Sequence, residues 1–274
     1  MKLKNIIHTA ALALGIAALG ASCTNIDDDD RLIYVKPPQV NRAVLIEDFT
    51  GQKCTNCPFA AIELEKIVEQ YGEDHVVAVA IHSGLGMKYN PAAKYQGLMN
   101  EQGSEYYSAW GSPAQPAGMV NRSSQPLAYT EWGKNVRAEI EKSAPLSLSV
   151  ENAYNEADRT LAISVEALGT DGNTDGKLQV WLIEDNIVSL QDMPKELGGG
   201  RNYEYVHKHV FRANVTADIW GDALSVKEGE KTSKTYSYTI PELWKAENVS
   251  VVAFVTDANN RNVKQVIKKS IINK

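Results

Sequence analysis

Two cysteines separated by two residues stand between a short apolar strand and a helix, and this arrangement limits the chain to few architectures. Residues 43–50 are apolar enough for a buried strand that ends at a turn. The cysteine motif 54–57 follows, and a helical periodicity after it runs to Tyr71. Residues 76–81 are continuously apolar, as in a strand covered on both faces of a sheet. We therefore predict a strand–helix–strand unit with the cysteine pair at the start of its helix.

Cysteines at the start of a helix are suited to thiol–disulfide chemistry. The unpaired N–H groups and the positive end of the helix dipole favour the thiolate, which is the reactive form. A second cysteine one turn further on can attack the mixed disulfide that the first one forms. We predict that Cys54 is the attacking thiol and the more exposed sulfur, and that Cys57 is the resolving thiol. A zinc site is not expected here, since a second pair of ligands does not accompany the motif.

The segment around the cysteines resembles the thioredoxin superfamily at residues 46–49, where Asp48 stands six positions before Cys54. The resemblance implies that Asp48 is buried and assists proton transfer at the resolving cysteine. It also implies a cis-proline that faces the cysteine pair. Pro116 is preferred for this role because a strand-like segment follows it directly, and Pro113 is the alternative.

The first 22 residues have the pattern of a secretory signal peptide. Lys2 and Lys4 precede an apolar run, residues 6–19, that is too short for a membrane-spanning helix, and small residues stand before Cys23. The end of this leader resembles a bacterial lipobox, which implies that Cys23 becomes the acylated first residue of the mature chain. We expect this lipid to hold the protein on a membrane. The alternative is an ordinary secreted protein with a chance cysteine.

Residues 23–42 are expected to form an acidic tether. The carboxylates of residues 27–30 repel one another, and two prolines at 37 and 38 stiffen the segment. An acidic run behind a lipidated cysteine also resembles the surface-export signal of Bacteroidetes lipoproteins, which implies a protein that faces outward from the outer membrane. The net charge of −6 and the scattered basic residues argue against nucleic acid as a partner.

The second half of the chain has the pattern of a β-rich unit. After a predicted helix at 130–142, about seven short alternating strands follow, one of them at 203–211. We predict an α/β thioredoxin-like domain at 43–144, followed by an all-β, immunoglobulin-like sandwich at 145–274.

Two patterns in the second half could hold a metal but are interpreted as structural. The segment 171–176 begins like a calcium loop, yet its twelfth position is Leu182 instead of a bidentate glutamate. His207 and His209 would share one face of the predicted strand, but no third ligand accompanies them. We therefore expect neither a metal nor a cofactor.

The string EDFTGQKCTNCPFA, together with QPAGMVNR and the lipoprotein leader, resembles the outer membrane protein 28 family of Bacteroidetes. This resemblance implies a thioredoxin-like domain joined to a C-terminal β-domain at the outer membrane. Two functions stay open. The first is a surface-anchored thiol–disulfide oxidoreductase that acts on thiol or disulfide-containing proteins. The second is a non-catalytic surface binding protein or adhesin whose cysteines form a structural disulfide.

Overall fold

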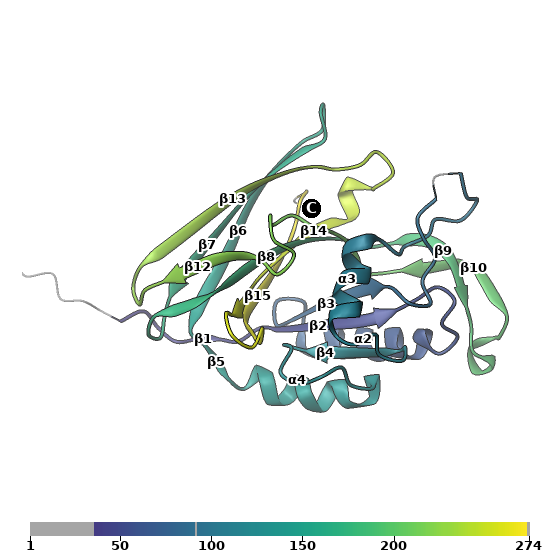
Figure 1. Cartoon of the computed structure of the whole chain (residues 1–274), viewed down its shortest axis with the longest axis horizontal. Coiled ribbons are helices and arrows are strands. Elements are labelled where there is room, and N and C mark those ends of the chain that lie inside the picture. The colour runs from purple at the N-terminus through teal and green to yellow at the C-terminus, as the bar shows by residue number, and fades with distance from the viewer. Residues whose placement is uncertain (1–35, 91, 273–274) are drawn as a thin grey trace, which may run out of the picture. The chain divides into compact units, whose positions relative to one another are not determined.

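One mixed sheet takes strands from both halves of the chain (Figure 1). Its order is β15-β14-β8-β11-β3-β2-β4, and β12 also pairs with β8. The strands are β2 (Val44–Thr50), β3 (Val76–His82), β4 (Ala117–Val120), β8 (Thr174–Glu184), β11 (Val210–Asn214), β12 (Asp222–Val226), β14 (Val249–Asp257) and β15 (Val263–Ser270). The computed structural model describes residues 36–90 and 92–272, and the chain from Lys36 onward is one compact unit.

The strand–helix–strand unit predicted around the cysteines is part of this sheet. β2 and β3 are parallel, and α2 (Cys57–Tyr71) connects them. β4 pairs antiparallel with the other edge of β2. Two further helices, α3 (Glu101–Ala109) and α4 (Trp132–Ile140), complete the α-helices of the described residues. Across that part of the chain, none of the helices has the length and apolar character needed to cross a bilayer.

The second layer is a three-stranded antiparallel sheet, β13 (Lys231–Thr239), β7 (Thr160–Gly169) and β6 (Leu146–Asn155). Its middle strand alternates strictly between buried and more exposed residues, which is typical of a sheet with one face on a core. The buried side chains of β7 pack with those of β8 and β14 in one apolar cluster. The two sheets therefore form a β-sandwich.

The fold class expected from the sequence is wrong. An α/β thioredoxin-like domain followed by a separate sandwich requires that the strands of the two halves lie in different sheets, whereas β2, β3 and β4 share one sheet with β8, β11, β14 and β15. The chain is mostly β and sandwich-like, with few helices. The link is β11, which pairs with β3 at Val210 and Ala80 and with β8 on its other side. This pairing covers an apolar strand edge that would otherwise be exposed to intermolecular pairing.

The apolar core also crosses the boundary that we expected between residues 144 and 145. One buried cluster combines aromatic and aliphatic side chains of β2, β3 and α3 with those of β8, β11 and β14, among them Leu45, Phe49, Ile81, Tyr106, Trp181, Phe211 and Phe254. The division into 43–144 and 145–274 stays a prediction. The shared core leads us to expect that both segments unfold in one transition.

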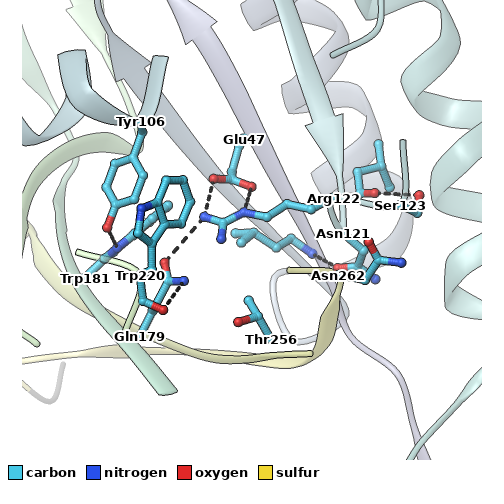
Figure 2. A network of polar contacts seen from close by, with 12 residues as sticks. Glu47, Tyr106, Asn121, Arg122, Ser123, Gln179, Trp181, Trp220, Thr256 and Asn262 are labelled. Carbon is cyan, nitrogen blue, oxygen red and sulfur yellow. Dashed lines mark hydrogen bonds and ion pairs between the residues drawn. The ribbon is translucent and has the colours of Figure 1, made fainter. Parts of the chain in front are cut away.

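A fully buried ion pair lies beside this cluster (Figure 2). Arg122 Nε donates to Glu47 Oε2 at 2.7 Å, and Arg122 Nη2 donates to Glu47 Oε1 at 2.8 Å. Both side chains have no exposed area. The guanidinium also lies over the rings of four aromatic residues, Tyr106, Trp181, Trp220 and Phe254, at 5.2–6.0 Å from their centroids. Charges from the first half of the chain are thus held among side chains from both halves.

Two short two-stranded sheets complete the fold. β1 (Val40–Asn41) pairs with β5 (Ser143–Ala144), so the last residues of the expected tether are ordered against the chain. β9 (Ile187–Asp192) and β10 (Arg201–His207) form a hairpin. The signal peptide, Cys23 and the acidic run 27–30 lie outside the described residues.

Candidate functional site

The cysteine pair lies between the end of β2 and the start of α2, as predicted. Cys54 and Cys57 form a disulfide with an S–S distance of 2.11 Å and a Cα–Cα distance of 5.4 Å. Cys57 is the first residue of α2, and Pro58 occupies the first turn, where its missing N–H leaves no helical bond unmade. The loop before the pair packs closely, because a Cβ on Gly51 would lie 2.5 Å from the backbone of Leu85.

A hairpin from the second half of the chain covers the disulfide. Cys54 and Cys57 are each only 2% exposed, so the expectation that Cys54 is the more exposed cysteine is wrong. In β9, Gln191 Nε2 donates to the carbonyl oxygen of Cys54 at 3.0 Å. In the loop before the pair, Gln52 Nε2 donates to Ser189 Oγ of β9 at 3.0 Å. These two buried amides hold the β9–β10 hairpin against the cysteine loop.

Asp48 is buried in β2, two residues before the strand ends. Its Oδ1 atom has no hydrogen-bond partner. Burial raises the pKa of Asp48 to about 8, because desolvation disfavours the charged carboxylate. The side chain therefore holds its proton most of the time at neutral pH and can release it at little cost in free energy.

The cis peptide bond among the described residues joins Gln115 and Pro116. Of the two prolines considered, the cis residue is therefore Pro116. β4 begins directly after it, with Ala117 opposite Phe49 of β2. The side chain of Gln115 donates from Nε2 to the carbonyl oxygen of Thr50 at 2.8 Å. Pro116 thus lies at the end of β2 from which the cysteine loop begins.

A pocket of about 400 Å³ opens beside the disulfide. The ends of β2 and β3, one face of α2 and residues 205–209, at the end of β10 and just beyond it, line it. Both Asp48 and Cys57 are among its lining residues, whereas Cys54 is not. The structure therefore brings Asp48 and the expected resolving cysteine to one cavity and leaves the expected attacking cysteine under the hairpin.

Two uncharged histidines contribute to this pocket. His82 ends β3 and His207 ends β10, and their ring centroids are 5.1 Å apart. Burial lowers the pKa of His207 to about 4. Burial also lowers the pKa of His82, and the neighbouring His207 and Arg212 add to this effect. His82 Nδ1 has no hydrogen-bond partner. Both rings are neutral at pH 7, so they offer hydrogen bonding without charge.

His209 connects α2 to the corner between β10 and β11. Its Nε2 lies 3.0 Å from Glu65 Oε1, and its Nδ1 lies 3.2 Å from Asp185 Oδ1. Burial lowers the pKa of His209, but the hydrogen bonds to Asp185 and Glu65 outweigh burial and raise it overall. The expectation that His207 and His209 share a strand face is wrong, because β10 ends at His207 and His209 has a positive φ of 55°.

Sequence reasoning missed His82 and Gln191. A signal existed for His82, since it is a polar residue directly after an apolar strand, and ligand sites often lie at the carboxyl ends of parallel strands. No local signal marks Gln191, because its role depends on a hairpin that reaches back across the chain.

Comparison with known proteins gives a family and a fold. The family model of the outer membrane protein Omp28 matches residues 103–274. HBP35 of Porphyromonas gingivalis is similar in structure, with a TM-score of 0.66 and 16% identity over 86% of this chain and 77% of that one. A domain of the outer membrane lipoprotein Omp28 from the same organism aligns with 47% of this chain and 88% of its own length, at 25% identity and a TM-score of 0.35. No curated protein matches the chain.

The family match covers well over half of the chain, from α3 to the C-terminus. The similarity to HBP35 supports the sandwich-like fold described above. The family is one of outer membrane proteins, which confirms the expected location at the outer membrane. The chain belongs to the Omp28 family of outer membrane proteins.

Proposed function

We propose that this protein is a surface-exposed lipoprotein, anchored through Cys23, whose Cys54–Cys57 disulfide exchanges with thiols and disulfides of partner proteins. The observation that supports exchange is Asp48, a buried carboxyl with an unpartnered oxygen in the same pocket as Cys57. A disulfide that only stabilises the fold needs no acid beside it. Burying a carboxyl without partners destabilises a protein, so its presence favours a chemical role.

The proposed exchange has two steps in the reduced protein. The Cys54 thiolate attacks one sulfur of a partner disulfide, forms a Cys54–partner disulfide and releases the other partner sulfur as a thiolate. Asp48, in its carboxylate form, then takes the proton of the Cys57 thiol. The Cys57 thiolate attacks Cys54 Sγ, re-forms the Cys54–Cys57 disulfide and releases the second partner thiolate. Two electrons pass from the cysteine pair to the partner, and the reverse sequence reduces the pair.

A second candidate function is supported by the burial of both cysteines. A non-catalytic binding protein or adhesin with a structural disulfide would keep its sulfurs covered, as the β9–β10 hairpin does here. The hairpin also exposes large apolar side chains, Val188, Tyr203 and Val206, that are available for contact with a partner.

Trapping experiments distinguish the two candidates. Reduced Cys57→Ser, treated with oxidised glutathione, is expected to keep glutathione on Cys54, because the resolving thiol is absent. Cys54→Ser is expected to exchange with nothing, and the wild type to release glutathione and re-form its disulfide. Mass spectrometry of the alkylated proteins reports each species. If iodoacetamide labels neither cysteine of the reduced, folded wild type, the structural disulfide is the better description. If it labels Cys57 first, the two roles are reversed.

The proposed anchor predicts a lipid on Cys23. Mass spectrometry of the N-terminal peptide of the mature protein is expected to show Cys23 as the first residue, with two or three acyl chains, since one chain alone gives only marginal binding. Cys23→Ser is expected to be released from membranes. An unmodified Cys23, or a mature chain that begins elsewhere, would refute the anchor without affecting the proposed exchange.

A further inference from the structure

The pocket beside the disulfide is a groove between a helix face and a strand edge. The α2 residues that line it recur at helical spacing, among them Pro58, Ile62, Glu65 and Glu69. On the opposite wall the last three residues of β10, 205–207, line the pocket together with the two residues that follow the strand. Side chains of a strand alternate between its two faces, so three consecutive lining residues indicate that β10 meets the groove with its backbone edge.

This edge of β10 is unpaired. β10 pairs with β9 on one side, and no strand of the described residues pairs with its other side. A free edge presents backbone donors and acceptors to an extended chain, which can add to the sheet as a further strand. The groove therefore offers main-chain hydrogen bonds on one wall and side-chain contacts on the other.

The rim of the groove is apolar and nearly balanced in charge. Ile62 of α2 is 41% exposed and Val206 of β10 is 47% exposed, and both line the groove. Of the charged lining residues, Glu65 contacts Lys208 and His209, while Glu69 and Lys66 carry opposite charges. Such a lining matches an uncharged, partly apolar segment better than an acidic or a basic one.

We infer that an extended, uncharged segment of a partner polypeptide docks in this groove as an added strand along the free edge of β10. Such a segment would bring a partner sulfur close to the Cys54–Cys57 disulfide, and in this respect the inference rests on the proposed exchange. The docking itself needs no sulfur chemistry. The groove thus selects an extended polypeptide, through backbone pairing with β10 and contact between an apolar side chain of the partner and the apolar rim.

The test uses the full chain with its disulfide intact and a blocked heptapeptide of threonine and valine with a central serine. The serine prevents covalent exchange, so only docking is measured, by titration calorimetry. The same peptide with N-methyl groups on alternate amides is the backbone control. We expect N-methylation to weaken binding about fivefold or more, as the loss of hydrogen bonds would.

Two variants and a matched control locate the bound peptide. Ile62→Glu and Val206→Glu place a charge on either wall of the groove and are each expected to weaken binding about fivefold or more. Val188→Glu is the control, because Val188 is 58% exposed and lies directly opposite Val206 on β9, but does not line the groove. It is expected to bind the peptide within about twofold of the wild type, since it removes no groove contact.

Several outcomes would overturn the inference. The inference fails if the wild type does not bind the peptide, or if it binds the N-methylated peptide with the same affinity. It also fails if Val188→Glu weakens binding as much as Ile62→Glu and Val206→Glu do. Concentration-dependent dimerisation that Val206→Glu abolishes would instead assign the edge of β10 to a second copy of the chain. Reduction of the disulfide by free glutathione, measured separately, tests the proposed exchange. Docking without reduction would refute the exchange alone, and reduction without docking would refute the groove alone.

Discussion

Replacing Asp48 by asparagine is expected to stabilise the protein at neutral pH and to remove the loss of stability that ionisation of Asp48 causes between about pH 4 and pH 8. The pKa of Asp48 is raised by burial from 3.8 to about 8 in the folded protein. Between these values the folded state holds a proton that the unfolded state releases. The contribution of Asp48 to the free energy of unfolding therefore falls as pH rises, by about 1.4 kcal/mol per unit, which is roughly 4 kcal/mol at pH 7.

Asparagine cannot ionise, so the variant avoids this loss. Its amide is still buried without a full set of partners, which costs about 1–3 kcal/mol. We expect Asp48→Asn to be more stable than the wild type by about 1–3 kcal/mol at pH 7 and to show no advantage at about pH 3, below the pKa of the carboxyl in both states. Urea unfolding of the oxidised proteins across this pH range measures the difference.

The exposed Asp175→Asn serves as a control, because it makes the same chemical change outside the core. It is expected to keep the pH dependence of the wild type. If the difference in stability between the wild type and Asp48→Asn is the same at pH 5 and pH 8, Asp48 does not carry the charge penalty that we assign to it. In the exchange assay, Asp48→Asn is expected to slow resolution by Cys57 while the first attack by Cys54 proceeds. A stabilised variant with slowed resolution would show why an unfavourable buried acid is kept.

The local structure around the cysteines was predictable because local patterns determine it. The apolar runs 43–50 and 76–81 correspond to β2 (Val44–Thr50) and β3 (Val76–His82), and the helix between them ends at Tyr71 as expected. Asp48 was found only through a resemblance, since nothing local marks it. It lies in a strand that β3 and β4 pair on either edge and whose residues are all buried.

The pocket could not be predicted, because a long-range pairing and a backbone turn create it. β11 pairs with β3 through Val210 and Ala80, which are far apart in the sequence. The predicted strand 203–211 is divided instead, since the backbone turns at His209 and separates β10 from β11. That turn places residues 205–209 along the groove. Alternation of apolar and polar residues carries no information about such a turn. The sequence therefore predicted neither the β10 wall of the groove nor the sheet that both halves of the chain share.

Breaking the buried Glu47–Arg122 pair is expected to destabilise the whole chain more than any single surface change. Glu47→Leu leaves a guanidinium without its carboxylate, and Arg122→Met leaves a carboxylate without its cation. Each side chain has no exposed area, so neither remaining charge can reach water. Loss of one partner of such a pair typically costs about 3–5 kcal/mol. Arg122→Met also removes the contacts of the guanidinium with four aromatic rings, so we expect it to be the more damaging of the two.

The double variant Glu47→Leu/Arg122→Met removes both charges together. Apolar replacement of a buried pair is often neutral, so its cost is expected to be smaller than the sum of the single costs by at least about 2 kcal/mol. Lys231→Met, which breaks an exposed ion pair with Glu166, is the matched control and is expected to cost less than about 1 kcal/mol. Additive effects of Glu47→Leu and Arg122→Met in urea unfolding would contradict this account.

The position of the pair also tests whether the two halves of the chain fold together. Glu47 comes from β2, whereas the rings of Tyr106 and Trp181 around Arg122 come from α3 and β8 (Figure 2). The ring of Phe254 from β14 and that of Trp220 also lie near the guanidinium. Loss of the pair should therefore lower the stability of both halves at once. We expect tryptophan fluorescence, which includes Trp132 of α4 and Trp244 near the sandwich, and far-ultraviolet circular dichroism to report the same unfolding midpoint in every variant. Two separate midpoints would instead support independent units at 43–144 and 145–274, in spite of their shared sheet.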